Sequence, residues 1–421
     1  MSTSSGHGRD GRPRVGLVLA GGAARGAYEV GVVQYILESV AKELGREVPL
    51  DVLCGTSVGA INACALAAYA QEPGRVRAAR LVKYWTEIRI PDVVRIDLRE
   101  VLALVRGLVG RLRGPVNEAG RRGGIFDPAG LERIIYNAIR FEDIDRNLDA
   151  GHLHGLSVST THVATGRTVV FLQRRDGAVP AWSQDQTIVP RAARIRATHA
   201  LASAAIPMLF PPVKIAGEYY VDGGLRQNVP LSPARRLGAD RLVVVNPRYL
   251  SPSGLLAPDA AAPIAGVPGP LFLLGKALNA LLLDRLDNDI DRLARINAIL
   301  EAGSRRFGAA FMGAINEELG HAPGRGLRSL EVVLVRSSED IGKLAGDFVR
   351  SPHFRQRAPG MLGRVMRRLA EDAATDEADL LSYMLFDGEF AGQLVEIGRS
   401  DARARHDELC AFFEGAVRGQ E

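Results

Sequence analysis

Two strand–loop–helix units follow one another at the start of the chain, and they constrain its fold more than any other feature. Residues 14–19 (RVGLVL) form an apolar, partly β-branched run, followed by the glycine-rich loop GGAARGA and a helix-like stretch over 28–40. Residues 50–54 (LDVLC), the turn GTSVG and a helix-like stretch over 60–70 repeat this order. Successive units of this kind are typical of a largely parallel sheet covered by helices. The sequence therefore predicts an α/β fold.

The composition is that of a globular protein with one large domain or two smaller ones. Of its 421 residues, 47% are hydrophobic and 24% are charged, which allows a sizeable core. The three cysteines are too few and too scattered for a disulfide framework, and none forms a C-x-x-C pair that could begin a zinc site. We therefore expect a reducing compartment.

Residues 1–13 are polar and lack the apolar stretch of a secretory signal, so we expect a disordered lead-in to a cytoplasmic protein. The formal charge of +5 is spread over the whole chain, without a zinc finger, an RNP-like motif or an internal repeat. We therefore expect no nucleic-acid partner. The oligomeric state cannot be inferred from these features.

The apolar pattern predicts a core over residues 14–250, which a later part of the chain rejoins. Residues 92–124 contain a basic amphipathic helix, and residues 251–325 are a Pro-, Gly- and Ala-rich linker followed by a helical insertion. The apolar run 271–283 in this insertion is too short to span a membrane. Residues 326–421 hold a late strand and helices. Since a lone strand needs a sheet to join, we expect them to complete or flank the core.

The amphipathic helix over 94–113 has two interpretations. Arginines beside apolar residues allow a helix to lie on an anionic membrane, which would give the protein peripheral membrane contact. Packing against the protein's own core is the more frequent use of such a helix. The same two interpretations apply to the run 271–283.

The stretch from Gly55 to Gly59 (GTSVG) has the G-x-S-x-G pattern of a nucleophile elbow, in which a serine lies on a tight strand-to-helix turn. Gly55 and Gly59 remove side chains that would collide in that turn. The following helix directs its free amides and positive dipole end toward the reacting oxygen. Although the bare pattern also occurs by chance in small-residue turns, its flanking strand and helix favour Ser57 as a nucleophile.

A serine hydroxyl needs a base to accept its proton, most often a histidine oriented by a carboxylate. None of the eight histidines lies in a sharp loop just after a buried strand, where that histidine would be expected. A carboxylate held near the hydroxyl and away from water can take this role. Asp222 follows the apolar residues YYV, and Gly223 and Gly224 allow a tight turn beside it. We predict that Asp222 is the base; the alternative is an ordinary Asp-Gly turn.

Ester hydrolysis also needs hydrogen-bond donors for the oxyanion of its tetrahedral intermediate. The loop after the first strand offers closely spaced backbone amides, those of Gly21, Gly22, Ala23, Ala24, Arg25 and Gly26. Because parallel strands bring the loops after them to one edge of a sheet, we expect this loop, Ser57 and Asp222 to meet there. The loop contains neither a dinucleotide-binding G-x-G-x-x-G motif nor a Walker A motif.

Taken in order, GGAARG, GTSVG and DGG resemble the patatin-like phospholipase family. The stretches LSVSTTHVATGRTVVF, SAAIPMLFPPV and DGGLRQNVPLSPARRLGADRLVVVNP are also similar to it, so the resemblance covers residues 14–250. SYMLFDGEF near the C-terminus looks like the tail of longer bacterial members. The resemblance implies a three-layer α/β/α fold with a mostly parallel central sheet, and hydrolysis of lipid acyl esters without a metal or other cofactor.

Carried over motif by motif, the resemblance implies a Ser57–Asp222 dyad that works through an acyl-enzyme, with lipid as the substrate. The loop 21–26 would supply the oxyanion hole, with Arg25 at the motif's basic position. Ala23 stands where the family often has glycine. Since a methyl group restricts positive φ angles, the sequence leaves open which amides point inward.

Two rival functions remain. A Ser-His-Asp α/β-hydrolase would keep the reaction but use a late histidine such as His321. A catalytically idle member would act as a lipid-binding scaffold, although intact Ser57 and Asp222 argue against this. Head group, acyl-chain length, positional preference and physiological role cannot be inferred from the sequence.

Overall fold

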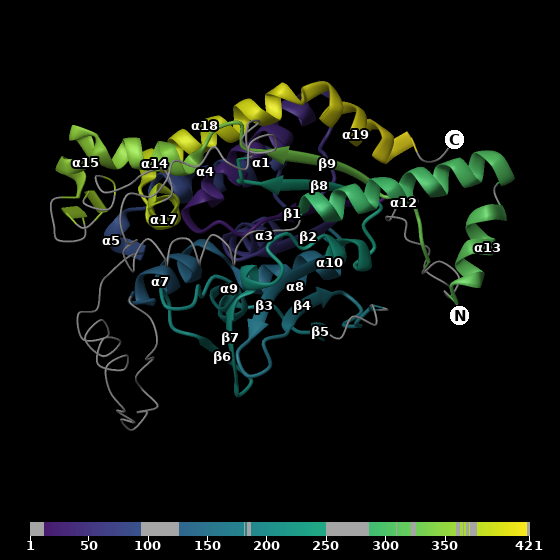
Figure 1. Cartoon of the computed structure of the whole chain (residues 1–421), viewed down its shortest axis with the longest axis horizontal. Helices are drawn as coiled ribbons and strands as arrows, with labels where there is room; N and C mark the ends of the chain where they lie inside the picture. Colours follow the sequence, from purple (N-terminus) through teal and green to yellow (C-terminus); the bar gives the residue numbers. More distant parts are fainter. Residues whose placement is uncertain are drawn as a thin grey trace, which may run out of the picture.

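The computed structural model describes residues 12–93, 126–180, 182, 187–249, 286–308, 310–320, 326–358, 363–364, 366–367, 370 and 377–418. In these residues the strands form one sheet with helices on both faces (Figure 1), so the predicted three-layer α/β/α fold is confirmed. The strands are β1 (Val15–Leu19), β2 (Val52–Thr56), β3 (Gly155–His162), β4 (Thr168–Arg174), β5 (Ile188–Ala192), β6 (Val213–Ile215), β7 (Glu218–Asp222), β8 (Arg241–Asn246) and β9 (Glu331–Arg336).

The helices lie between these strands and beyond the last of them. Up to β9 they are α1 (Gly26–Tyr35), α2 (Ala41–Glu43), α3 (Val58–Ala68), α4 (Gly74–Thr86), α5 (Ile90–Val93), α7 (Ala129–Ala138), α8 (Phe141–Ala150), α9 (Ala197–Ser203), α10 (Leu231–Arg236), α12 (Leu286–Phe307) and α13 (Ala310–Glu318). After β9 come α14 (Ile341–Arg350), α15 (Pro352–Arg357), α17 (Glu377–Met384), α18 (Gly388–Ala404) and α19 (His406–Arg418). Short 3-10 helices, η1 (Ala23–Arg25) and η3 (Gly223–Leu225), precede α1 and follow β7.

The sheet has the order β5-β4-β3-β2-β1-β8-β9, and it is mostly parallel. β1 pairs in parallel with β2 and β8, and β2 pairs in parallel with β3, whereas β3 and β4 are antiparallel. β1 and β2 are buried over their whole length, because helices cover both faces of the sheet. The late strand β9 pairs in parallel with β8 at the edge of the sheet. The division of the chain into domains stays a prediction.

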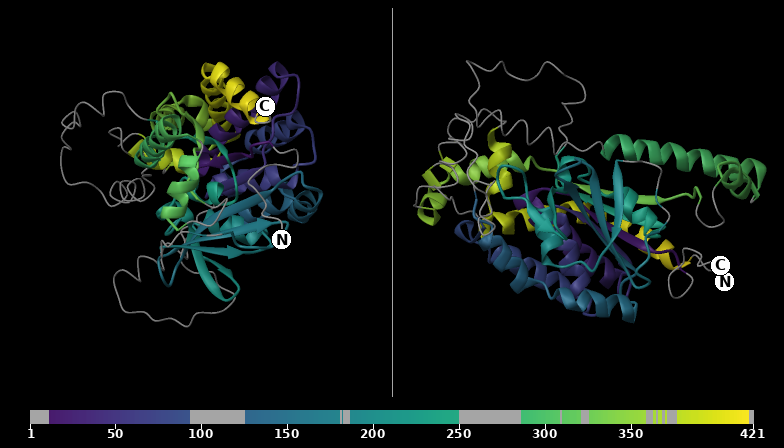
Figure 2. Two further views of the ribbon diagram at one scale, coloured as in Figure 1. Left: turned by 90° about the vertical axis from the view of Figure 1, so that its right-hand side faces the viewer. Right: turned by 90° about the horizontal axis from the view of Figure 1, so that it is seen from below.

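Alternate residues of the central strands face two separate cores. Leu17 and Leu19 face a large core that also holds side chains of α1, α3 and α18, whereas Val18 faces a smaller core with residues of α10 and the start of α12. In the right-hand view of Figure 2, blue helices lie on one side of the strands and α12, in green, lies on the other. This period of two is what a sheet between two helical layers requires.

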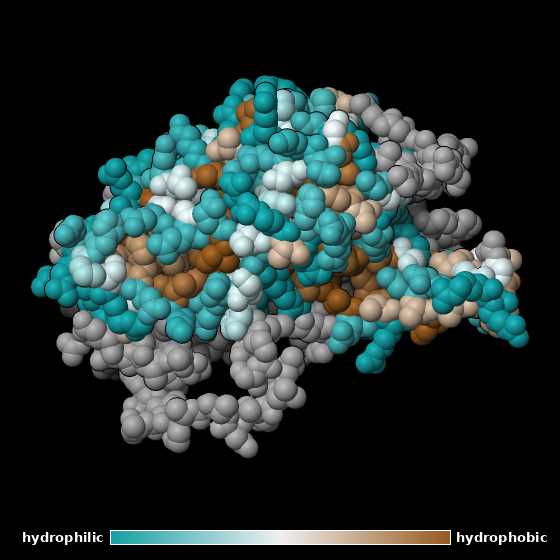
Figure 3. Space-filling view, turned by 90° about the horizontal axis from the view of Figure 1, so that it is seen from above, coloured by the Kyte–Doolittle hydropathy of each residue, from teal (hydrophilic) through white to brown (hydrophobic). Residues whose placement is uncertain are grey.

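α12 and α13 project from one end of the molecule as an arm (Figure 1). An apolar groove of about 260 Å³ lies between these helices, and Ile299, Phe307 and Leu319 on them are exposed. Figure 3 shows hydrophobic residues gathered in two places on a mostly hydrophilic face, one of them next to this arm. Within the described ranges, no helix is long and apolar enough to cross a membrane.

Several sequence predictions concern residues outside the described ranges. Of the predicted amphipathic helix within 92–124, only the end of α5 at Val93 belongs to the described residues, and the run 271–283 lies outside them. The predicted lead-in lies outside them up to residue 11. Its end is held in place, because the Arg12 guanidinium is ion-paired with Asp51 at 2.7 Å.

Candidate active site

Ser57 and Asp222 are brought together by two strands that meet end to end beside β3. Thr56, the last residue of β2, pairs with Ser159 of β3, and Asp222, the last residue of β7, pairs with the next residue, Thr160. Because β4 occupies the other side of β3, β7 continues the line of β2 in the opposite direction. The chain therefore leaves β2 at Ser57, next to the point where β7 ends with Asp222.

This arrangement corrects one sequence expectation. Parallel strands do bring the loop after β1 and Ser57 to one edge of the sheet, but β7 is antiparallel to β3. β7 enters from a hairpin with β6, closed by Ala216 and Gly217 with φ angles of 48° and 89°. Two residues at positive φ are typical of the tight turn that joins antiparallel strands. β7 thus runs toward the end of β2 in the direction opposite to the parallel strands.

The turn at Ser57 has the geometry of a nucleophile elbow. Ser57 has φ 55° and ψ −127°, which is strained for a residue with a side chain, and α3 begins at the next residue. A Cβ atom on Gly55 would lie 2.2 Å from the Gly59 carbonyl oxygen, and one on Gly59 would lie 2.5 Å from the carbonyl oxygens of Leu19 and Ala20. β1, β2 and α3 therefore approach too closely for side chains at these two positions.

The Ser57 hydroxyl donates a hydrogen bond to Asp222 Oδ2 at 2.6 Å. The other carboxylate oxygen, Oδ1, accepts the Gly224 N–H at 2.7 Å, which fixes the rotation of the carboxylate. A Cβ atom on the intervening Gly223 would lie 2.3 Å from the Ser159 carbonyl oxygen, so this turn also requires a glycine. The Ser57 side chain and Asp222 are buried, with 3% and 0% of their surface exposed.

The surroundings of Asp222 tune its proton affinity. Burial raises the pKa of Asp222 to about 7, against the lowering effect of the hydrogen bonds from Ser57 and Gly224. A carboxylate with such a pKa can accept a proton from a hydroxyl and return it near neutral pH. Geometry and proton affinity together allow Asp222 to serve as a base for Ser57.

A second serine, Ser203 at the end of α9, supports the elbow. Its Oγ accepts the Ser57 N–H at 2.8 Å and donates to the Ser159 carbonyl oxygen at 2.7 Å, and the side chain is fully buried. The sequence pattern does not indicate this residue. The available signal is a hydroxyl at the end of the small apolar helix ATHALAS, which needs a partner when the helix is buried.

We expect Ser203→Ala to lower the free energy of unfolding by about 1–3 kcal/mol, because it removes the hydrogen bonds to two buried backbone groups. A less constrained Ser57 should also react more slowly, by roughly tenfold. Thermal unfolding and the labelling rate of Ser57 by a serine-directed phosphonate measure the two effects. Ser157→Ala is the matched control, since Ser157 is equally buried in β3 and its Oγ makes no hydrogen bond to a described N or O atom. Equal behaviour of both variants would contradict the assignment.

The glycine-rich loop lies directly against Ser57. A Cβ atom on Gly21 would be 3.1 Å from Ser57 Cβ and 2.1 Å from Asn228 Oδ1. The Gly21 N–H already donates to the Asn228 carbonyl oxygen at 3.1 Å, and those of Arg25 and Gly26 close turns inside the loop. Within the described part of the chain, the loop amides without a backbone acceptor are those of Gly22, Ala23 and Ala24.

Ala23 adopts a positive φ of 47°, despite its methyl group. The left-handed region costs an L-residue roughly 1–2 kcal/mol. Ala23 thus keeps the backbone conformation that a glycine would take more easily. Backbone strain of this kind is typical of functional sites.

The histidines of the described ranges lie outside the dyad. His199, near Ser203 on α9, is buried, which lowers its pKa to about 4, and its Nδ1 accepts the Arg196 N–H at 3.1 Å. Among the described residues, no histidine is hydrogen-bonded to Ser57 or Asp222. His321 lies outside the described residues.

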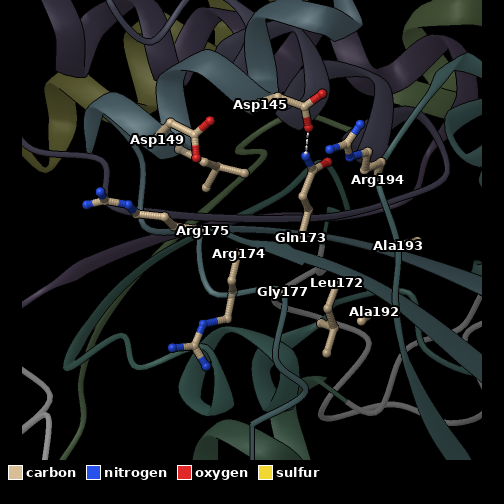
Figure 4. Close-up of a pocket in the computed structure, with 11 residues that line it drawn as sticks. Asp145, Asp149, Leu172, Gln173, Arg174, Arg175, Gly177, Ala192, Ala193 and Arg194 are labelled. Atoms are coloured by element: carbon tan, nitrogen blue, oxygen red, sulfur yellow. Dashed lines mark hydrogen bonds between the residues drawn. The ribbon is translucent and has the colours of Figure 1, made fainter.

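A cavity of about 360 Å³ lies at the C-terminal end of β4 (Figure 4). Arg174, which lines it, is beside the start of β3, whereas Asp222 is beside the end of β3, so the two sites are at opposite edges of the sheet. In Figure 4, Arg174, Arg175 and Arg194 point in different directions, and Asp145 is hydrogen-bonded to Gln173. The cavity is therefore separate from the dyad.

Comparison with known proteins points to one family. The sequence model of the family "Patatin-like phospholipase" matches residues 17–235, which is more than half of the chain. "Patatin-like phospholipase domain-containing protein 7" of Rattus norvegicus is 24% identical over 232 residues, and protein 6 of that name from Homo sapiens is 25% identical over 232 residues.

These matches cover 55% of this chain and only 13% of each relative. Among solved structures, VipD from Legionella pneumophila aligns over 91% of this chain and 94% of its own, with 13% identity and a TM-score of 0.27. The stretch matched by the family sequence model contains the glycine-rich loop, Ser57 and Asp222. The chain belongs to the patatin-like phospholipase family.

Proposed function

We propose that the protein is a serine acyl hydrolase that cleaves fatty-acyl esters of phospholipids or other lipids through a Ser57–Asp222 dyad. The observation that carries this proposal is the 2.6 Å hydrogen bond from Ser57 Oγ to Asp222 Oδ2 at a strained strand-to-helix turn. Membership of the patatin-like phospholipase family supports a lipid substrate. The reaction draws on no metal or other cofactor.

In the first half-reaction, Ser57 Oγ attacks the ester carbonyl carbon while Asp222 accepts the hydroxyl proton. The negative charge moves to the carbonyl oxygen, where the amides of Gly22, Ala23 and Ala24 are the donors best placed to bind it, because they lack backbone acceptors among the described residues. The tetrahedral intermediate then loses its alkoxide, which takes the proton from Asp222. An acyl-enzyme on Ser57 and a lysolipid or alcohol result.

The second half-reaction repeats these steps with water as the nucleophile. Asp222 accepts a proton from water as its oxygen attacks the acyl carbon, and the same amides bind the new oxyanion. The bond to Ser57 Oγ breaks, and Asp222 returns the proton to it. The fatty acid leaves, and the enzyme regains its initial state.

The two rival functions have less support. A Ser-His-Asp mechanism needs a histidine at Ser57, and the partner that Ser57 Oγ has among the described residues is Asp222. A catalytically idle scaffold has no need of a strained serine or of a buried carboxylate with a raised pKa. These features cost folding energy and are typical of active sites.

The direct test is fatty-acid release from phosphatidylcholine vesicles, with and without phosphatidylglycerol, and from triacylglycerol emulsions. We expect release by the wild type and phosphonate labelling of Ser57, both absent from Ser57→Ala. Faster release and co-sedimentation with the anionic vesicles would support peripheral membrane contact, which is part of the proposal. Release by Ser57→Ala, or an unlabelled and inactive wild type, would contradict the assigned chemistry.

A further inference from the structure

SYMLFDGEF, residues 382–390, lies beyond the stretch that the family sequence model matches. It runs from the end of α17 to the start of α18, and α17 packs against η1, the 3-10 helix of the glycine-rich loop. This segment therefore meets the candidate oxyanion loop from the far end of the chain.

Two adjacent residues of SYMLFDGEF hold the side chain of Arg25. Its Nε donates to Ser382 Oγ at 2.7 Å, and its guanidinium lies 4.3 Å from the centroid of the Tyr383 ring. The Arg25 side chain is only 7% exposed. A buried cation needs hydrogen-bond and electrostatic partners, and an aromatic face is a favourable one when water is excluded.

A second set of contacts connects SYMLFDGEF to Gly26, at the end of the glycine-rich loop. Phe386 stacks on Trp85, with ring centroids 6.3 Å apart and an interplanar angle of 14°. Trp85 Nε1 donates to Asn62 Oδ1 at 3.0 Å, and Asn62 Nδ2 donates to the Gly26 carbonyl oxygen at 3.1 Å. The side chain of Arg25 and the backbone of Gly26 are thus both fixed from this segment.

The residues of the loop that precede Arg25 need such support. Ala23 is held at a positive φ, and the Gly22–Ala24 amides must keep their direction without backbone acceptors among the described residues. A strained backbone persists only when its surroundings determine it from several sides. Displacing a transition-state donor by a fraction of an ångström weakens catalysis more than it weakens substrate binding.

We infer that Ser382 and Tyr383 are positioning residues, which hold Arg25 and thereby fix the amides that bind the oxyanion. The inference rests on the proposed acyl-hydrolase function and assigns a task in it to the C-terminal part of the chain. Neither residue touches the reacting atoms in this scheme. Their effect should therefore lie in kcat and in the reactivity of Ser57.

The test compares Ser382→Ala and Tyr383→Leu with the wild type in the full-length chain. We expect kcat on a p-nitrophenyl ester, and the rate constant for phosphonate labelling of Ser57, to fall by roughly 10- to 100-fold, with KM changed less than about twofold. Tyr383→Phe keeps the ring beneath Arg25 and should restore the wild-type kcat.

A stability control distinguishes the loss of positioning from a general loss of stability. Tyr69→Phe removes the hydrogen bond to the Ala138 carbonyl oxygen (2.9 Å) at the end of α3 opposite to Ser57, so it should lower the melting temperature without changing kcat. Unchanged kcat and labelling in Ser382→Ala and Tyr383→Leu, beside an active wild type and an inactive Ser57→Ala, would overturn this inference alone. A wild type without activity or labelling would overturn the proposed function and this inference together.

Discussion

Asp222→Asn is expected to lower kcat for ester hydrolysis by roughly 10³- to 10⁴-fold while the protein stays folded. The reason is the direction of one hydrogen bond. Because the Gly224 N–H binds Oδ1, the substituted amide must place its oxygen there and its NH₂ group toward Ser57. Ser57 Oγ then accepts a hydrogen bond where it previously donated one, and nothing takes its proton.

The pH dependence gives a second readout of the same residue. The base acts in its ionised form, so kcat/KM of the wild type should rise with pH, with a midpoint of about 7, and level off above it. The folded pKa lies above the unfolded value of about 3.9, so the stabilising contribution of Asp222 is present at low pH and is lost as pH rises through about 7. The stability of Asp222→Asn relative to the wild type should therefore increase from about pH 5 to about pH 8.

Asp143→Asn serves as the matched control. Asp143 is also buried, but it lies on α8 and pairs with Arg140 and Arg146, so its substitution should leave kcat unchanged. Hydrolysis by Asp222→Asn above a tenth of the wild-type rate, or a profile without a rise near pH 7, would point to a different base.

The two strand–loop–helix units are readable from sequence because their signals are local. β1 (Val15–Leu19) lies within the run at 14–19, and β2 (Val52–Thr56) begins and ends two residues later than the run at 50–54. Apolar residues, glycines and helix-like spacing in one short window suffice for this prediction. The position of Ser57 between a strand and a helix follows from the same window.

The direction of β7 cannot be predicted from a short stretch of sequence. The residues EYYVD indicate a strand but not its neighbour, and the pairing with β3 joins positions far apart in sequence. The hairpin turn at Ala216 and Gly217 makes β7 antiparallel to β6, but it does not fix the direction of β7 relative to β3. β5 was missed for another reason: it contains Pro190 and Arg191 and lies at the edge of the sheet, where apolar alternation is weak.

The supporting residues of the site are the hardest to predict. Ser203 binds backbone groups of two other elements, and Ser382 meets Arg25 across 357 positions of the chain. No periodicity or spacing records such partners, because a single hydroxyl looks the same in sequence whether or not it is bonded. Ser57 and Asp222 lie in the recognisable motifs GTSVG and DGG, whereas Ser203 lies in neither.

Gly398→Ala is expected to lower the free energy of unfolding by about 3 kcal/mol or more, or to prevent folding. α1 and α18 cross with their backbones in contact, so that a Cβ atom on Gly398 would lie 2.1 Å from the Tyr28 carbonyl oxygen. On the facing helix, a Cβ atom on Gly31 would lie 2.0 Å from the Val395 carbonyl oxygen. The added atom meets backbone and not a flexible side chain, so the helices must separate to admit it.

Gly392→Ala on the same helix is the matched control, to be compared with Gly398→Ala by urea unfolding and by ester hydrolysis. The nearest atom to a Cβ there is Thr86 Cγ2 at 4.0 Å, so alanine should be neutral or stabilise the helix by up to about 1 kcal/mol. Equal stabilities would mean that the helix crossing is not tight. Since α1 begins where the glycine-rich loop ends, a separated α18 should also slow hydrolysis by any folded Gly398→Ala. The C-terminal helix then contributes to the fold and to the reaction through the same contact.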